Sequence, residues 1–412
     1  MWPGVAVAAA GPAFFMMESP MAIPRTRGFT GPALLSYGFR PFFLLGSLHA
    51  GLIMLVWLPM IGGHLTTASH FAPVDWHIHE MLFGYVPAIV TGFLLTAIPN
   101  WTGRLPVQGL PLLALVLLWL AGRLAIASST LIGWQAAMLV DCAFLAAVAG
   151  AAATEIVAGR NWRNLKVLLP LGVLFLANVA FHLEVRFDGI SDVSRRLGIA
   201  AIIVLITVIG GRIIPSFTRN WLVRENPGRL PQPFGRYDVA SILASVAALG
   251  FWVVAPDAAS TAGVMLAAGL LQLARLARWA GDRTLRDPLV LILHLAYLLM
   301  PVGFFAVGLS ILFPDQIARA AGFHAFGTGA VGAMTLAVMV RATLGHTGQA
   351  LRASTGVTVI FAAILVAATA RILAATGEGM PGLVELSGVA WMIAFLGYAA
   401  LFGRALMSPR LR

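Results

Sequence analysis

The sequence predicts an all-α membrane protein, a bundle of about twelve transmembrane helices, from its composition and from the length of its apolar runs. Of its 412 residues, 59% are hydrophobic and only 10% are charged. Soluble globular domains carry about 25% charged residues, so one ordinary core cannot bury this many apolar side chains. The composition therefore excludes a water-soluble enzyme, a disordered protein and a nucleic-acid-binding protein, and it makes the lipid bilayer the expected environment.

Twelve apolar runs follow one another, each close to the roughly 20 residues that an α-helix needs to cross a bilayer. They are apolar on all sides, as helices facing lipid or a bundle interior are, whereas a β-barrel would show short alternating segments. The runs cover residues 42–62, 79–99, 109–127, 131–153, 165–183, 197–215, 238–255, 260–280, 289–312, 322–345, 354–375 and 383–405. We therefore expect a flexible N-terminal tail at 1–41, one transmembrane domain at 42–405 and a C-terminal tail at 406–412.

Basic side chains lie mostly on one side of these runs. With the N-terminus placed inside, the inner loops and tails hold 21 of the 27 basic residues and the outer loops hold six. Because cytoplasmic loops carry the excess of Lys and Arg, both termini are expected in the cytoplasm. The single cysteine, Cys142, excludes a disulfide framework and a thiolate metal site, so histidine would do most of any metal binding.

Histidines from three distant parts of the chain reach the expected outer side of the membrane. His77 and His79 open the second run, His182 ends the fifth and His324 opens the tenth. Imidazole suits copper, iron and zinc, and two axial imidazoles can hold a haem. Burying a polar group inside a membrane bundle costs free energy, and such groups tend to be functional. We therefore expect these four histidines to be metal or haem ligands rather than side chains that are only hydrated at the membrane interface.

The spacing of His77 and His79 leaves their joint role open. Two residues apart on a helix, they point about 200° away from each other. Both can serve one site only if the helix begins at or after His79; otherwise one of them faces elsewhere, for example toward a second metal. His79 is the better candidate to face inward, because Glu80 and Met81 follow it into the membrane.

His64 and His70 belong to an exposed outer loop and need no functional explanation. On the other side of the membrane, His294 lies near the inner end of the ninth run and His346 at the inner end of the tenth. These last two histidines could form an inner centre of their own.

Three carboxylates are placed to assist such sites. Glu80 and Glu184 are candidates to orient the second nitrogen of a ligand histidine. Asp141 lies at the middle of the fourth run, where a carboxylate is either protonated, paired or part of a proton path. Arg123 of the third run is the candidate partner of Asp141, although the two differ in expected depth.

Four arginines lie at the expected inner boundary and could hold haem propionates or other anions. They are Arg40, Arg212, Arg219 and Arg341. Ordinary anchoring at the lipid headgroups is the alternative interpretation, and it is the commoner role of arginine at this depth.

Several segments resemble signatures of the NnrS family. They cover residues 38–43, 76–84, 210–220, 287–297 and 324–348, in the order found in that family. Family members are polytopic bacterial membrane proteins that contain haem and copper and are associated with nitric oxide metabolism and nitrosative stress. The resemblance, over about residues 36–405, implies a haem- and copper-binding protein of the bacterial inner membrane. Within the matching motifs the implied ligand candidates are His77, His79, His182, His294, His324 and His346.

A fold-level analogy with haem–copper oxidases would place a haem between the second and tenth spans, on His79 and His324. The sixth and seventh runs contain no histidine, unlike the corresponding oxidase spans, which argues against a full oxidase-like site.

The activity itself stays open at this stage. A reductase of nitric oxide, a haem-binding sensor and an assembly factor would share every candidate residue, and no residue is assigned as catalytic. A reductase would also need an electron donor, for which a cytochrome docking on the outer surface is the candidate. A twelve-span secondary transporter is the alternative from another class, but it leaves the gathered histidines unexplained.

Overall fold

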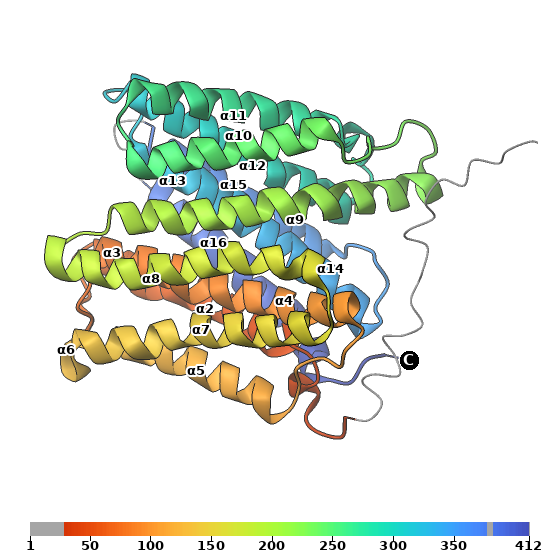
Figure 1. The fold of residues 1–412 in the computed structure, drawn as a ribbon, viewed down its shortest axis with the longest axis horizontal. Helices are drawn as coiled ribbons and strands as arrows, with labels where there is room; N and C mark the ends of the chain where they lie inside the picture. The colour runs from red at the N-terminus through yellow and green to blue at the C-terminus, as the bar shows by residue number, and fades with distance from the viewer. Residues whose placement is uncertain (1–28, 377–381, 412) are drawn as a thin grey trace, which may run out of the picture.

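The computed structural model describes residues 29–376 and 382–411. Within these residues twelve helical spans are long and apolar enough to cross a membrane, and no β-strand occurs. The prediction of an all-α bundle with about twelve spans is therefore confirmed. The spans run back and forth between two ends of the molecule (Figure 1).

The first six spans contain a π-helical segment, η2, between α3 and α4. Their bounds are α2 (Phe39–Ile61), α3–η2–α4 (Pro73–His79, Glu80–Tyr85, Val86–Thr102), α5 (Leu110–Ala127), α7 (Trp134–Ala158), α8 (Leu168–Asp188) and α9 (Val193–Glu225). Short helical turns flank them at η1 (Ala33–Leu35), α6 (Ser129–Ile132) and η3 (Trp162–Val167).

The last six spans also contain a π-helical segment, η5, which lies between α13 and α14. Their bounds are α10 (Arg236–Val254), α11 (Ala259–Ala277), α12 (Pro288–Leu312), α13–η5–α14 (Arg319–His324, Ala325–Gly332, Ala333–Thr347), α15 (Thr355–Leu373) and α16 (Leu383–Met407). A short turn, η4 (Gly281–Arg283), precedes α12. π-Helical segments inside α-helices are often found at functional sites.

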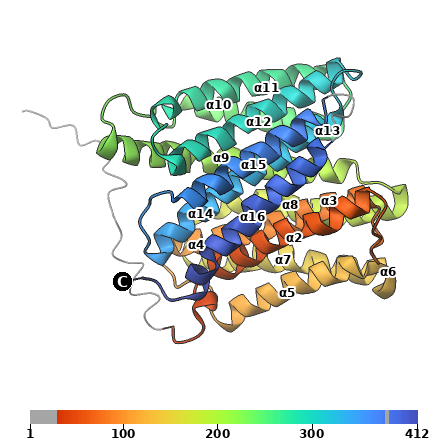
Figure 2. The same ribbon diagram turned by 180° about the vertical axis from the view of Figure 1, so that it is seen from behind.

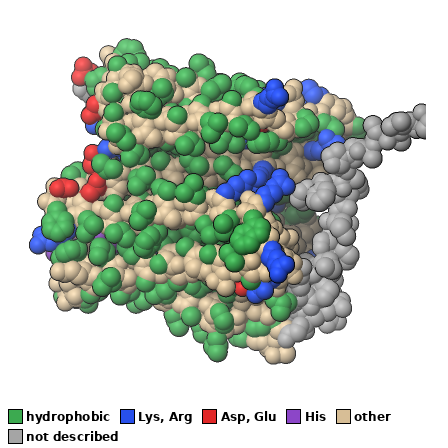
Figure 3. Space-filling view, in the orientation of Figure 1, with side chains coloured by type: hydrophobic (Ala, Val, Ile, Leu, Met, Phe, Trp, Pro, Cys, Tyr) green, Lys and Arg blue, Asp and Glu red, His purple; other side chains and the backbone are tan. Residues whose placement is uncertain are grey.

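We call the end at which residues 62–72 join α2 to α3 the first-loop end. Figures 1 and 2 show α3, α6 and α13 at this end and the C-terminus at the opposite one. On the face that Figure 3 shows, hydrophobic side chains spread along the length of the bundle, and most visible Lys and Arg side chains lie toward the end opposite the first loop. Leu117, Leu124 and Leu243 are among the exposed apolar residues, which is the surface expected against lipid rather than water.

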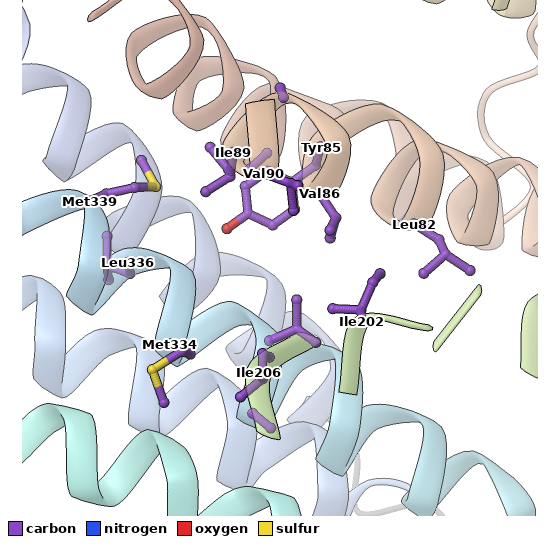
Figure 4. Close-up of a cluster of buried hydrophobic side chains, with 14 of the residues drawn as sticks. Leu82, Tyr85, Val86, Ile89, Val90, Ile202, Ile206, Met334, Leu336 and Met339 are labelled. Carbon is purple, nitrogen blue, oxygen red and sulfur yellow. The ribbon is translucent and has the colours of Figure 1, made fainter. Parts of the chain in front are cut away.

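Packing brings distant spans into contact in the middle of the bundle. α16 packs against α2 and α15, while η5 packs against α9, α12 and α15. Between η2, α9 and α14, apolar side chains such as Leu82, Tyr85, Ile202 and Met334 form a buried cluster (Figure 4). The second and tenth spans therefore lie on either side of a shared interior.

The second span begins earlier than its apolar run indicates. α3 begins at Pro73, at the first helical position, where a proline costs no hydrogen bond. Asp75 then accepts hydrogen bonds from Ser191 N and Oγ, at 3.2 and 2.6 Å, which ties this polar turn to the loop before α9. His77 and His79 consequently both lie inside a helix.

Two other boundaries differ from the expected ones. α2 begins at Phe39, so Arg40 belongs to the first span rather than to the tail, while residues 1–28 lie outside the described part of the chain. α9 continues past Pro215 to Glu225 and takes in the first part of the expected loop at 216–237. A proline interrupts only part of the hydrogen-bond ladder, and helices in a membrane tolerate this.

Candidate functional site

The early start of α3 separates His77 from His79. Because the helix is already formed at both residues, their side chains leave it in nearly opposite directions. His77 borders a cavity between α2, α9, α13 and α16, whereas His79 joins a polar cluster with residues of α7 and α8. The two histidines therefore belong to two different sites. Of the two alternatives that their spacing left open, a shared site is excluded, and His77 and His79 face different parts of the bundle.

A cavity of about 530 Å³ lies toward the first-loop end of the bundle. This volume is within the range of sites that bury a small cofactor. Most of its walls are apolar, and the aromatic rings of Trp57, Trp252 and Trp391 contribute to them. Both π-helical segments line it, through residues such as Tyr85 of η2 and Gly327 of η5.

Two imidazoles from distant spans line this cavity, His77 of α3 and His324 of α13. The His77 ring stacks on Trp57, with ring centroids 4.2 Å apart and planes 28° apart. Its Nδ1 atom is buried and has no hydrogen-bond partner among the described residues. His77 is thus held by stacking and retains a nitrogen that could bind a metal.

Four arginines line the same cavity, and none of the described residues that line it is acidic. They are Arg195, Arg196, Arg319 and Arg371. All four lie near the ends of spans, at the first-loop end. Their positions in the sequence indicated only the orientation of the chain in the membrane. Their grouping requires the packing of α9, α13 and α15 and could not be predicted from their positions along the chain.

The four arginines expected to bind anions do not line this cavity. Arg40 Nη1 donates to the carbonyls of Leu406 and Ser408, at 2.8 and 2.6 Å, and so satisfies the C-terminal end of α16. The Arg341 guanidinium lies over the Phe217 ring, 3.9 Å from its centroid. The remaining two are exposed on α9, namely Arg212 and Arg219. These four arginines therefore lie outside the cavity, and their role as anion contacts stays a prediction.

His79 belongs to a buried group centred on Asp141. Asp141 Oδ2 accepts a hydrogen bond from Asn178 Nδ2 at 2.8 Å and lies 3.2 Å from both His79 Nε2 and His182 Nε2. The side chains of His79, Asp141 and His182 are almost fully buried, and their ligand atoms all lie within 4.8 Å of one another. Among the described residues, this is the one group of three or more such side chains close enough to hold a metal ion.

A second carboxylate and one guanidinium complete this group. Arg123 forms a close ion pair with Asp141, and its Nη1 donates to Glu80 Oε2 at 2.9 Å. Glu80 Oε2 also lies 3.0 Å from His49 Nε2. The predicted partnership of Arg123 and Asp141 is present because α7 begins at Trp134, which places Asp141 near the first-loop end rather than at mid-depth.

Three phenylalanine rings close the group off from water. Phe71 lies 5.0 Å from the His79 ring and 5.2 Å from the His182 ring, measured between centroids. Phe83 and Phe181 lie 5.4 and 5.3 Å from His79. With neutral imidazoles, the two carboxylates and one guanidinium leave a formal charge of −1 in apolar surroundings, and one further positive charge would neutralise it.

Glu184 does not join either site. Its carboxylate accepts hydrogen bonds from the backbone N–H groups of Asp192 and Ser194, both at 3.0 Å, and so stabilises the start of α9. Its role is therefore in the fold rather than in orienting a ligand.

The two inner histidines have separate surroundings. His294 Nε2 lies 2.8 Å from Thr218 Oγ1, and the His346 ring packs on Tyr37 and Phe39. No contact between the two histidines occurs among the described residues, so the structure gives no support to an inner centre.

Asn178 is a site residue that sequence reasoning missed. It lies one helical turn before His182 on α8, and side chains four residues apart share a helix face. An amide at this spacing from a candidate ligand histidine was the signal that could have identified it.

A second buried polar network lies near the other end of the bundle and joins α10, α11 and α12. Arg275 Nε donates to Asp238 Oδ1 at 2.9 Å, and Arg275 Nη1 donates to Tyr297 Oη at 3.0 Å. Tyr297 Oη in turn donates to Gln272 Oε1 at 2.7 Å. These residues are fully or almost fully buried and do not line the cavity, so the network stabilises the packing of these helices.

Replacing Asp238 with alanine is expected to destabilise the protein by about 3 kcal/mol or more, because the Arg275 guanidinium would stay buried without its carboxylate. A lower thermal unfolding temperature in detergent measures this loss. The control Asp282→Ala removes an exposed ion pair with Arg229 and should cost less than about 1 kcal/mol. Equal shifts in the two variants would contradict the structural role of the buried pair.

The comparisons with known proteins agree with this architecture. A comparison with curated proteins gives no match. A family model described as NnrS protein matches residues 33–410, which include both histidine sites and all twelve spans up to the end of α16. The chain therefore belongs to the NnrS family.

Proposed function

We propose that this membrane protein binds haem in the cavity between His77 and His324, and that it acts in nitric oxide metabolism or nitrosative-stress defence by binding or reducing nitric oxide. The observation that carries the proposal is the pair of imidazoles, from distant spans, on the walls of one largely apolar cavity. Two histidines are a known axial ligand set for haem iron. Membership of the NnrS family supports the link to nitric oxide.

The residues of the cavity fit a flat, mostly apolar group that carries a metal. Gly327 lines the cavity, and a Cβ atom placed on it would meet no atom within 4 Å, so the backbone of η5 is open to close approach. The buried Nδ1 atom of His77 has no other partner among the described residues. The stacked Trp57 ring limits the orientations of the His77 imidazole and so prepares it for ligation.

When bound, haem would supply an iron centre that can bind diatomic gases once one of the two histidine ligands gives way. The residues of the chain hold and orient it. Trp252, Trp391 and Val331 supply apolar walls that exclude water. Because nitric oxide is small and uncharged, it can reach such a cavity from the lipid as well as from water.

The same proposal assigns copper to the group of His79, Asp141 and His182. Imidazole and carboxylate ligands suit copper, and the three ligand atoms are already gathered. With neutral imidazoles the group carries a formal charge of −1, which favours a cation. Asn178 holds Asp141 in place through its side-chain hydrogen bond, as outer partners of metal ligands do.

The orientation in the membrane is part of the proposal. The excess of basic residues at the end opposite the first loop favours a cytoplasmic location for both termini, in the inner membrane of a bacterium. Both sites then lie toward the outer face, where an electron-donor cytochrome could dock if the protein turns over nitric oxide. A reductase, a sensor and an assembly factor share these residues, so the rate of nitric oxide consumption distinguishes them.

The test is an absorption spectrum of the detergent-purified protein, oxidised and then reduced, with and without nitric oxide, together with iron and copper analysis. We expect a Soret band that shifts on addition of nitric oxide, and both metals bound. A colourless, metal-free protein after supplementation with haem and copper would contradict the proposal and favour a twelve-span transporter. Asp141 is poorly suited to ion coupling in such a transporter, because Arg123 already pairs with it.

A further inference from the structure

The arginines at the cavity carry more positive charge than the neighbouring carboxylates neutralise. Arg195 and Arg196 share one carboxylate, that of Asp192, and Arg319 pairs with Asp257 at 2.6 Å. The fourth arginine, Arg371, has no ion pair within the described ranges 29–376 and 382–411. Among the described residues, four guanidinium groups therefore face two carboxylates, which leaves two positive charges without an ion pair.

These charges lie where an anionic group of a bound molecule would meet them. Arg371 lies in the last turn of α15 and lines the cavity together with His77 and His324. Arg196 is 4% exposed, and its Nε atom is buried without a hydrogen-bond partner among the described residues. The Nε atom of Arg195 is likewise buried and has no hydrogen-bond partner among the described residues. Buried donors without partners are costly, so they favour a ligand that can accept their hydrogen bonds.

The rest of the cavity selects against a small, fully hydrated anion. Its walls are largely apolar, and its volume of about 530 Å³ exceeds the space that a carboxylate or phosphate alone would fill. The arginines lie close to the ends of their spans, whereas Tyr85, Val86 and Val331 lie about three helical turns into theirs. A suitable ligand is therefore apolar over most of its surface and acidic along one edge.

We propose that Arg371, with the cationic group formed by Arg195, Arg196 and Arg319, binds the two carboxylates of a planar, mostly apolar dicarboxylic acid such as a tetrapyrrole. The carboxylate edge then points to the first-loop end. Arginine suits this role because its guanidinium stays charged and can bind a carboxylate through two hydrogen bonds. The inference rests on the proposed haem site and adds the side chains that would recognise the acid groups.

The experiment compares haem with its dimethyl ester, which keeps the macrocycle and iron but has no carboxylates. Apoprotein in detergent is titrated with each compound, and binding is followed by absorption. We expect wild-type protein to bind haem at least roughly tenfold more tightly than the ester, as hydrogen bonds between charged groups predict. Arg371→Gln should weaken haem binding about tenfold and leave ester binding unchanged. Arg186→Gln, at the same end but outside the cavity, is the matched control and should change neither.

The outcomes separate this inference from the proposed function. Equal affinities of the wild-type protein for haem and ester, or equal losses of both in Arg371→Gln, would overturn the role of the arginines while leaving a haem site intact. Failure of the wild-type protein to bind either compound would overturn the haem site itself. The wild-type comparison needs no variant, so it decides the question even if Arg371→Gln does not fold.

Discussion

Purified His77→Ala and His324→Ala proteins are expected to lose the Soret band of the wild-type protein. Both side chains line the same cavity, and each would supply a nitrogen that holds the haem iron. Truncation to alanine leaves space beside the cavity, so imidazole added to His77→Ala should restore part of the band. Absorption spectra and iron content per chain measure the effect.

The control for this pair is His70→Ala, which removes an exposed loop histidine. Its spectrum should match that of the wild-type protein. Full haem content in both His77→Ala and His324→Ala would show that the iron ligands lie elsewhere in the chain.

Removing His182 is expected to abolish copper binding while leaving haem in place. His182 contributes one of three gathered ligand atoms and does not line the cavity. Asp141→Asn should act in the same direction, because it removes a ligand oxygen and also the negative charge that favours a cation. Asn178→Ala keeps all three ligands but removes the hydrogen bond to Asp141, and a loss of about 10- to 100-fold in copper affinity is expected.

Copper content and competition with a copper chelator measure these losses, and the absorption spectrum reports on haem in the same samples. Asp188→Asn is the matched control, because it neutralises an exposed carboxylate at the end of the same helix, α8. Wild-type copper content in both His182→Ala and Asp141→Asn would rule out this group as the copper site.

The number of spans could be predicted from the sequence because a bilayer imposes a minimum length on every apolar helix. All twelve spans are present. The ends of the spans were less predictable, because the polar turn from Pro73 to His79 has no apolar signature and is held instead by Asp75 and the loop at Ser191. That one boundary decides whether His77 and His79 share a site.

The candidate ligands could be predicted in part. The sequence places His77, His79, His182 and His324 at the same end of the bundle, but their grouping depends on helix rotation, which apolar runs do not specify. Helices that are apolar on all sides carry no stripe to indicate which face turns inward. The pairing of His77 with His324, in place of His79 with His324, therefore required the structure.

The arginines that line the cavity also could not be predicted from the sequence. Positive charges near span ends indicate orientation, and that role alone explains their presence in most loops. Whether such an arginine faces a cavity depends on neighbours distant in the chain. Arg371 of α15 and His77 of α3 line one cavity only because α16 packs against both α15 and α2.

The most direct test of two separate centres is the iron and copper content of His77→Ala and His79→Ala, measured side by side. The two variants differ by two positions on one helix, so general effects on folding and insertion are closely matched. We predict opposite losses: His77→Ala loses iron and keeps copper, while His79→Ala loses copper and keeps iron. Loss of both metals from both variants, or of iron from His79→Ala alone, would contradict the account.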